Sequence, residues 1–582
     1  MQNYKLTDDS SRLFLYQRRE TIAVKVGNIE IGGDNPIRVQ SMANTDTNDI
    51  DSSVQQALRI EKAGGELIRF TAQGIKEATN LKQIRENFRK SGGAAPLVAD
   101  IHFNPQAAFV AAEAVEKVRI NPGNFVDRVH TLQRFDYTDE EYQQEIEKIK
   151  DKLYPLLDIC KANHTAIRIG VNHGSLSDRI LSRYGDTPRG MVESCMEFLR
   201  LCMAYDFYNI VISIKASNTV IMVQTVRLLV DTMNKAGMKF PLHLGVTEAG
   251  DGEDGRVKSA LGIGALLQDG IGDTIRVSLS EAPENEIPVA RKLVDYITTT
   301  APIRSCDTVV AKNSGLVDPF TFKRRSSFSV DKIGDGQVPV VVSNTNVTVD
   351  GLSPDYCATD FQLSIKTVFA TISTYDAIKS ELDEHTVVVL DSVGYPSSQD
   401  GIGGQREFIH RMLSDGLKNP VILRRRYMDS NIEDLQIKAG ADYGQFFIDG
   451  LVDGIWIEAP QVKEESVVSL MFTILQGSRA RVSKTEYVSC PSCGRTLFDL
   501  QTTLAKIKER TSHLKGLKIG VMGCIVNGPG EMADADYGYV GSARGKVNLY
   551  KGQTCLEKAI PQEEAVDRLI QLIKENGDWK DN

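Results

Sequence analysis

The first 300 residues repeat one pattern, in which a short run rich in β-branched residues is followed by an amphipathic stretch. Stretches such as 52–63, 141–162 and 220–236 carry the helical period between the runs. Eight such units in a segment of this length are typical of a (β/α)8 TIM barrel. An open doubly wound sheet is the alternative, but no Gly-x-Gly-x-x-Gly follows the first run. A hairpin pattern at 23–33 comes first, and the eight predicted strands are 37–42, 66–71, 96–103, 117–121, 166–171, 209–214, 241–246 and 273–279.

Polar side chains stand at or just after the C-terminal ends of these runs, where barrel active sites form. A single arginine there is more often a structural ion pair, but four arginines and a lysine at equivalent positions require an anion. Guanidinium groups bind phosphate oxygens in a bidentate manner, so the pattern predicts a phosphorylated substrate. The predicted substrate-binding residues are Arg69, Asp100, His102, Arg119, Asn121, Arg168, Asn172, Lys215, Ser217, Arg276 and Ser278.

Glu248 is the carboxylate of most interest at this predicted mouth. It follows the seventh run and precedes Ala249-Gly250. Facing cations, it is expected to be ionised unless substrate binding desolvates it. Its role is either to orient arginines or to donate and relay protons. Asp100 is assigned the orienting role for neighbouring arginines.

Three cysteines lie in two short Gly/Pro-rich loops near the end of the chain. Cys490 and Cys493 form a Cys-Pro-Ser-Cys motif, and Cys524 opens a loop that ends at Glu531. Three thiolates without a fourth favour a cubane iron–sulfur cluster whose remaining iron takes a weaker oxygen ligand. A structural zinc site is the alternative, with His513 or Cys555 as the fourth ligand.

The bulk composition is that of an ordinary globular protein, with 582 residues, 41% hydrophobic and 25% charged. The formal net charge of −9 argues against a nucleic-acid partner. The N-terminus has no apolar segment of the signal-peptide type, and no apolar run approaches membrane-spanning length. Nine cysteines, mostly scattered, fit a reducing compartment, so we expect a cytoplasmic protein and no disulfides.

The sequence predicts three domains, a barrel at 1–302, an insert at 303–484 and a cluster domain at 485–582. The insert has four strand-like runs with helical patterns between them, which predicts a folded α/β domain rather than a linker. No catalytic residue is assigned to it. The last domain reads as a small α/β fold, in which a strand at 518–522 leads to Cys524.

Taken together, these motifs resemble those of the 4-hydroxy-3-methylbut-2-en-1-yl diphosphate synthase family, in its large three-domain form. The resemblance covers about 20–302 and 485–582. It implies that the insert is a degenerate barrel, as in the three-domain members of the family, and that the last domain is similar to the cluster domain of sulfite reductases. No single motif would suffice to identify the family. The motifs are 98–103, 119–124, 167–172, 215–217, 244–250 and 276–279, together with the two cysteine loops.

The resemblance implies a substrate, 2-C-methyl-D-erythritol 2,4-cyclodiphosphate, and a place in the methylerythritol phosphate route to isoprenoids. Two electrons open the ring and one oxygen leaves as water, giving 4-hydroxy-3-methylbut-2-enyl diphosphate. It implies a [4Fe-4S] cluster on Cys490, Cys493 and Cys524, with Glu531 on the fourth iron and in the catalytic set, and Asn527 beside the substrate. Reduced ferredoxin or flavodoxin would be the electron donor.

The sequence also leaves two alternative functions open. The first is a non-redox barrel enzyme that binds a phosphate or a pterin and has a zinc-stabilised tail. The second is an electron-transfer protein with a vestigial barrel, which the intact set of strand-end cations disfavours. Because the insert can act as a spacer, we also expect the cluster domain to close on the barrel of its own chain, with hinges near 302 and 483–486. A homodimer through other surfaces stays open.

Overall fold

The computed structural model describes residues 16–101, 104–126, 136–301, 316–392, 401–525 and 528–581. The chain divides into two compact units. One unit contains 20–255, 272–291 and 484–582, which are most of the barrel and the C-terminal domain. The other contains 1–19, 256–271 and 292–483, which include the insert. The predicted domain boundaries at 302 and 484 stay a prediction.

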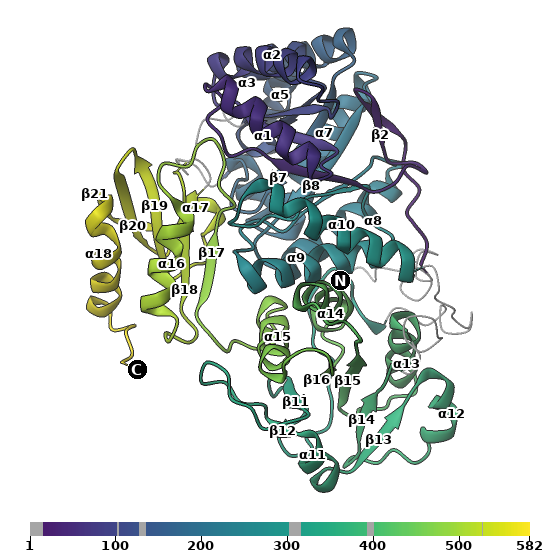
Figure 1. Ribbon diagram of the computed structural model, residues 1–582. Coiled ribbons are helices and arrows are strands. Elements are labelled where there is room, and N and C mark those ends of the chain that lie inside the picture. Colours follow the sequence, from purple (N-terminus) through teal and green to yellow (C-terminus); the bar gives the residue numbers. More distant parts are fainter. Residues whose placement is uncertain are drawn as a thin grey trace. The chain divides into compact units, whose positions relative to one another are not determined.

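The predicted barrel is confirmed as a closed ring of eight parallel strands (Figure 1). Neighbours in the chain pair in sequence order from β3 to β8, and β10 lies between β9 and β3. A parallel bridge between Ile212 and Leu242 closes the ring between β8 and β9. The strands are β3 (Arg38–Met42), β4 (Leu67–Thr71), β5 (Leu97–Asp100), β6 (Lys117–Ile120), β7 (Ala166–Asn172), β8 (Ile210–Lys215), β9 (His243–Leu244) and β10 (Thr274–Ile275).

The hairpin predicted at 23–33 is also present, as the antiparallel strands β1 (Val24–Val26) and β2 (Ile29–Ile31). Its apolar residues Val24, Val26 and Ile31 form a cluster with residues such as Leu67 and Val98, near the N-terminal ends of barrel strands. The hairpin therefore covers the end of the barrel opposite the predicted mouth.

The barrel helices begin where the sequence offers a capping side chain. Asp49, Asn104, Thr138 and Asn218 each accept a hydrogen bond from the first turn of the helix that they precede. These caps fix where the chain turns from each strand into the next helix. The helices are α1 (Ile50–Lys62), α2 (Ile75–Lys90), α3 (Pro105–Ala114), α4 (Pro122–Phe125), α5 (Asp139–Asn163), α6 (Asp178–Tyr184), α7 (Pro188–Ala204), α8 (Thr219–Lys235), α9 (Gly252–Gln268) and α10 (Pro283–Thr300).

The C-terminal domain is a five-stranded mixed sheet with two helices, α16 (Leu500–Thr511) and α18 (Gln562–Glu575), packed against it. The first three strands are parallel and the last two antiparallel. Because β17 and β18 are parallel neighbours, the loops that follow them leave the same edge of the sheet. Its strands are β17 (Glu486–Ser489), β18 (Lys518–Met522), β19 (Tyr537–Ala543), β20 (Lys546–Lys551) and β21 (Thr554–Pro561), and α17 (Gly528–Glu531) is a single turn.

The insert contains a six-stranded sheet in which every pairing is parallel. Its end strands β12 and β13 do not pair with each other within the described ranges, so the sheet is a half-barrel there. The strands are β11 (Val340–Ser343), β12 (Tyr356–Cys357), β13 (Thr367–Ala370), β14 (Val387–Leu390), β15 (Val421–Arg426) and β16 (Gly454–Glu458). The helices are α11 (Ala358–Ser364), α12 (Tyr375–Ile378), α13 (Ile402–Ser414), α14 (Ile432–Ile448) and α15 (Glu464–Gly477), with a 3-10 turn at Ile372–Thr374.

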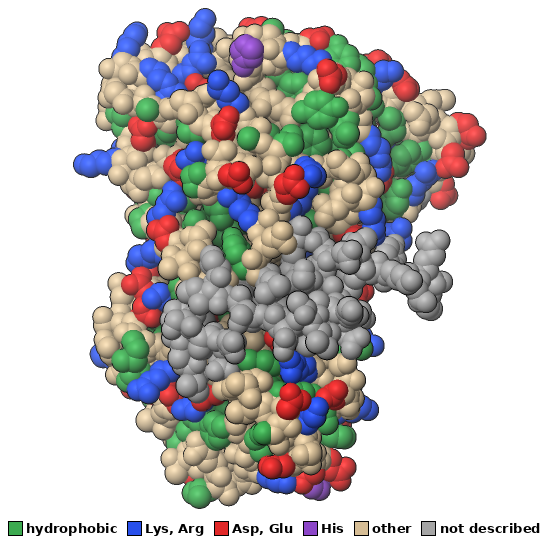
Figure 2. Space-filling view, turned by 90° about the vertical axis from the view of Figure 1, so that its right-hand side faces the viewer, with side chains coloured by type: hydrophobic (Ala, Val, Ile, Leu, Met, Phe, Trp, Pro, Cys, Tyr) green, Lys and Arg blue, Asp and Glu red, His purple; other side chains and the backbone are tan. Residues whose placement is uncertain are grey.

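The surface of the described residues shows no large field of one charge in the view of Figure 2, where acidic and basic side chains are interspersed. This distribution agrees with the argument against a nucleic-acid partner. Within the described residues, no helix has both the length and the apolar character that a membrane span requires.

Candidate functional site

One pocket joins the mouth of the barrel to the cysteine loops of the C-terminal domain, and both walls belong to the same compact unit. It has about 700 Å³ of empty space, counting its opening to solvent. The barrel contributes Met42, Arg69, Asp100, Arg119, Arg168, Asn172, Lys215, Thr247, Glu248, Arg276 and Ser278. The C-terminal domain contributes Cys490, Pro491, Ser492, Cys493, Arg495, Thr496, Met522, Gly523, Cys524, Gly528 and Glu531.

The five predicted cations all line this pocket, but they differ in their partners. Arg119 Nη1 lies 3.1 Å from Asp100 Oδ1, and Arg276 donates to both oxygens of Glu286 at 3.0 and 2.8 Å. The other three have no carboxylate partner within the described residues. Arg69 donates only to the thioether of Met42, at 3.2 and 2.8 Å, and Nε and Nη1 of Arg168 are buried without a hydrogen-bond partner. Within the described residues, Arg69, Arg168 and Lys215 therefore carry positive charge that no carboxylate partner neutralises.

Burial and mutual repulsion make the charged forms of three of these cations less favourable. Burial lowers the pKa of Arg69 to about 10, with Arg276 and Arg119 adding to the shift and Asp100 opposing it. Burial also lowers the pKa values of Arg168 and Lys215 well below their ordinary values, and neighbouring arginines lower both further. An anion in the pocket would relieve both the desolvation and the repulsion.

Two strand glycines make room for these long side chains. A Cβ atom on Gly170 would lie 2.6 Å from Nε of Arg119, and one on Gly245 would lie 2.8 Å from Nζ of Lys215. Each distance is shorter than a van der Waals contact. Both cations therefore depend on a neighbour in the barrel wall that has no side chain.

Glu248 is buried in the pocket and has a left-handed backbone, with a φ of 50°. Such a conformation is uncommon for a residue other than glycine and is often retained at functional sites. Burial raises the pKa of Glu248 well above its ordinary value, and the nearby carboxylate of Glu531 raises it further. The ionised state expected from the sequence is therefore disfavoured, because the fold itself desolvates this carboxyl group before substrate arrives. Its side-chain hydrogen bonds involve Thr247 and Glu531 rather than an arginine.

The three cysteines come together because their loops leave one edge of the sheet. Cys490 directly follows β17 and Cys524 follows β18. Cys490 Sγ accepts a hydrogen bond from the backbone N–H of Gly523 at 3.2 Å, which ties the two loops together. The thiol of Cys490 is deeply buried, and burial raises its pKa above its ordinary value, with Cys493 adding to the shift.

The zinc alternative needed His513 or Cys555 as a fourth ligand, and neither residue lines the pocket. The His513 ring packs edge-on against Trp579, at 5.0 Å between centroids. Cys555 lies on β21, where its Sγ donates to Glu557 O at 3.5 Å. Within the described residues, no group of three or more His, Cys, Asp or Glu side chains is placed to hold a single metal ion.

Direct contacts hold the C-terminal domain on the barrel mouth. Ser280 Oγ lies 2.7 Å from Ser489 Oγ and 3.1 Å from the carbonyl oxygen of Cys490, and Asn172 Nδ2 donates to Glu531 Oε1 at 3.1 Å. Gly174 and Gly530 meet backbone to backbone, since a Cβ on either would come within 2.5 Å of the other residue's carbonyl oxygen. The site in this structure is built from one chain.

Most of the residues predicted from the sequence meet in this pocket, including all the barrel cations, Glu248, Glu531 and the three cysteines. Asn121 does not line it, because its side chain caps α4 by accepting from Gly123 N at 3.2 Å. Ser217 is half-buried and also does not line it. His102 and Asn527 lie outside the described residues.

The sequence analysis did not assign Arg495 or Met42, and both line the pocket. Burial acts to lower the pKa of Arg495, but the thiol groups of Cys493 and Cys524, together with Asp100, outweigh it and raise the pKa above its ordinary value. A cation two positions after a cysteine in the same tight loop was the signal that would have found it. Met42 gave no such signal, because a methionine at a strand end is usually a packing residue.

This geometry defines a class, a barrel enzyme whose cationic mouth is closed by a cysteine-bearing domain. Models of two family domains match the chain, the GcpE TIM-barrel domain over residues 21–291 and the GcpE protein C-terminal domain over 486–575. The chain belongs to the GcpE family, the 4-hydroxy-3-methylbut-2-en-1-yl diphosphate synthases.

Three full-length relatives illustrate the similarity. The 4-hydroxy-3-methylbut-2-en-1-yl diphosphate synthase (flavodoxin) of Bacteroides fragilis is 53% identical, covering 98% of this chain and 97% of its own. The enzyme of the same name from Leptospira interrogans is 42% identical, covering 98% of each chain. The chloroplastic ferredoxin-type enzyme of Oryza sativa is 41% identical, covering 97% of this chain and 88% of its own. The similarity therefore includes the insert, and the three-domain resemblance inferred from the sequence is confirmed.

Proposed function

We propose that this chain catalyses the two-electron reduction of 2-C-methyl-D-erythritol 2,4-cyclodiphosphate to 4-hydroxy-3-methylbut-2-enyl diphosphate and water. The observation that carries the proposal is a single pocket in which a cationic barrel mouth faces three cysteines and two glutamates. An anionic substrate held by the barrel would lie beside a redox group held by the C-terminal domain. Relatives that match this chain over nearly their whole length are named as this synthase.

The barrel cations bind the diphosphate. Arg69, Arg168 and Lys215 have no carboxylate partner in the described part of the chain, so they supply net positive charge. Arg119 and Arg276 are fixed by Asp100 and Glu286 and supply directed hydrogen bonds. Each charge-assisted hydrogen bond to a phosphate oxygen contributes about 1.5–3 kcal/mol. The substrate would also replace water around cations whose charge burial now opposes.

The cysteines suit a [4Fe-4S] cluster, whose role when bound is to deliver electrons one at a time to the substrate. Cys490, Cys493 and Cys524 would each hold one iron. A cubane cluster binds each thiolate at a different iron, so its ligands have to lie around a common space. The three cysteines meet this requirement because they line one pocket. Glu531 is the candidate oxygen ligand for the fourth iron. In this structure the carboxylate of Glu531 accepts a hydrogen bond from Asn172 instead.

Glu248 is the proposed proton donor for the departing oxygen. Burial raises the pKa of its carboxyl group well above the ordinary value, which favours the protonated form, and its neighbour Glu531 belongs to the opposite wall of the pocket. A buried acid of raised pKa between the substrate-binding wall and the cysteine-bearing wall can supply the proton that water formation needs. The proposed electron donor is a flavodoxin or a ferredoxin, as the names of the relatives indicate for them.

The function is tested with protein purified without oxygen. We expect four iron atoms and four acid-labile sulfides per chain, and turnover of the cyclodiphosphate with a chemical reductant in place of the protein donor. Zinc without iron, or an iron-loaded protein that leaves the cyclodiphosphate unchanged, would refute the proposal. The zinc result would favour the non-redox barrel enzyme instead.

We further propose that each active site is complete within one chain, because both walls of the pocket come from the same chain here. An Arg119→Ala chain lacks part of the barrel site, and a Cys524→Ser chain lacks a cysteine ligand. A mixture of the two, after subunit exchange, should show no more activity than the sum of the separate proteins. A wild-type sample carried through the same exchange controls for recovery. Activity well above that sum would mean that sites form between chains.

A further inference from the structure

Among the described residues, the pair formed by Arg276 and Glu286 is the one buried ion pair of the mouth whose carboxylate does not itself line the pocket. Arg276 stands just after β10, and Glu286 lies on the first turn of α10. Glu286 is 1% exposed and Arg276 is 2% exposed. The carboxylate therefore reaches the pocket only through the arginine that it holds.

Three of the four contacts that the structure shows for this carboxylate constrain Arg276 or the segment that carries it, and the fourth, from Ser41 on β3, holds the carboxylate itself. Nε and Nη2 of Arg276 donate to the two oxygens at 3.0 and 2.8 Å. Ser41 Oγ lies 2.7 Å from Oε2, and the backbone N–H of Leu279 donates to Oε1 at 3.2 Å. A bidentate pair fixes the plane of a guanidinium as well as its position. With Nε and Nη2 engaged, Nη1 is the nitrogen that faces Met42 and the pocket, 3.6 Å from the thioether sulfur.

We propose that Glu286 is a positioning residue that makes Arg276 a fixed, directional donor and so selects the cyclic diphosphate over simple phosphates. Its negative charge cancels much of the attraction that Arg276 would exert on any anion. What Arg276 gains is a fixed direction, which only a ligand of matching shape can use. The unpaired cations Arg69, Arg168 and Lys215 attract anions in general, and the Glu286–Arg276 pair discriminates among them. This inference rests on the proposed function of the same pocket.

The discriminating variant is Glu286→Gln in the cluster-loaded protein, with binding measured by calorimetry without oxygen. The amide keeps the size of the side chain but loses its charge and one acceptor. Affinity for the cyclodiphosphate should fall about tenfold, by the loss of one oriented charge-assisted hydrogen bond. Affinity for inorganic diphosphate should stay the same or rise, because the local positive charge increases. In an Arg276→Ala background, Glu286→Gln should no longer lower the affinity for the cyclodiphosphate.

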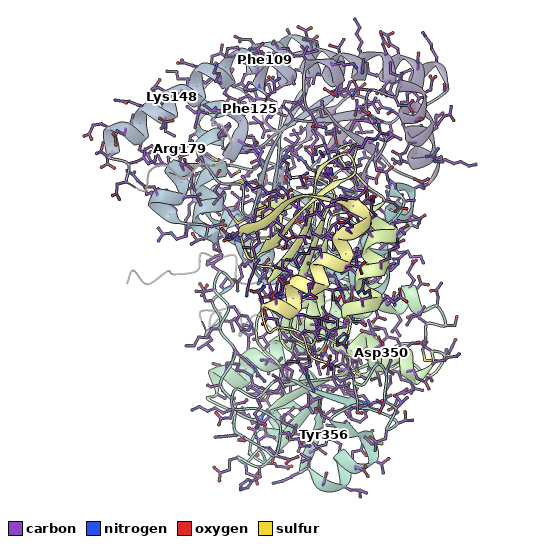
Figure 3. All side chains as sticks on the ribbon, turned by 90° about the vertical axis from the view of Figure 1, so that its left-hand side faces the viewer. Phe109, Phe125, Lys148, Arg179, Asp350 and Tyr356 are labelled. Atoms are coloured by element: carbon purple, nitrogen blue, oxygen red, sulfur yellow. The ribbon has the colours of Figure 1, made fainter. Side chains whose placement is uncertain are left out.

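A second buried pair in the same barrel offers a matched control. Glu197 accepts from Nε and Nη2 of Arg179 at 3.2 and 2.8 Å, both residues are buried, and neither lines the pocket. Figure 3 labels Arg179 on α6, among the outer helices of the barrel. Glu197→Gln should lower the melting temperature, as Glu286→Gln does, but leave both ligand affinities unchanged.

The outcomes separate the inference from the function on which it rests. Equal weakening of both ligands by Glu286→Gln, or no change in either, overturns the positioning role. Failure of the wild-type protein to bind either ligand overturns the anion-binding mouth itself. If Glu286→Gln does not fold, Ser41→Ala removes one contact of the carboxylate without changing any charge, and it should weaken only the cyclodiphosphate, by a smaller factor. Unchanged selectivity in Ser41→Ala would then count against the proposal.

Discussion

Replacement of Cys524 by serine is expected to remove most of the iron and all turnover. A serine hydroxyl ionises far less readily than a thiol and is a poor ligand for the irons of a cluster. The same result is expected for Cys490→Ser and Cys493→Ser, since all three side chains line the pocket. Iron and acid-labile sulfide, measured together with activity, give the readout, and circular dichroism shows whether the fold survives.

Cys555→Ser is the matched control for this prediction. Cys555 belongs to the same domain and is partly buried, but it lies on β21 and does not line the pocket. Its replacement should leave iron content and turnover at the wild-type level. Full iron content in any one of the three loop variants would exclude that cysteine as a ligand. Loss of iron in Cys555→Ser would instead indicate that Cys555 is a fourth metal ligand, as in the zinc alternative.

The barrel could be predicted from the sequence because its strands are buried on both faces and read as short β-branched runs. Each of the eight predicted runs overlaps a strand of the ring, although the last two strands are only two residues long. The strand ends were also informative. A charged residue such as Arg168 or Lys215 at the end of an apolar run is out of place in the core, and barrels place such residues at the C-terminal mouth.

The insert was harder to predict, because β12 and β13 carry little periodic signal. Tyr356–Cys357 is only two residues long, and Phe369 within β13 is 40% exposed. The arginines that end β15 differ in their surroundings. Arg424 is held by Glu458 and Asp391, and Arg425 is buried beside Gln405 and Asp442, so both are internal to the insert, whereas Arg426 is exposed.

Other features of the site depend on tertiary contacts that no local pattern reveals. Glu286 is ten positions beyond Arg276 on the opening turn of a helix, where an acidic residue is expected merely to favour the helix dipole. The chain reversal between β10 and α10 brings the two together. Likewise, the desolvation of Glu248 arises because the C-terminal domain covers the mouth and brings Glu531 against it. The sequence of the barrel alone predicts an exposed, ionised carboxylate there.

Glu248→Gln is expected to lower kcat by about two to four orders of magnitude, the usual contribution of a general acid. Binding of the cyclodiphosphate should change by less than about twofold, because the amide preserves shape, and burial, which raises the pKa of Glu248, disfavours the charge that the amide lacks. Iron content should be unchanged. Glu253→Gln, five positions further on and outside the pocket lining, is the control and should retain full activity. A loss of substrate affinity with little change in kcat would show instead that Glu248 orients the arginines, since a residue that only positions the binding groups weakens the ground state and the transition state together.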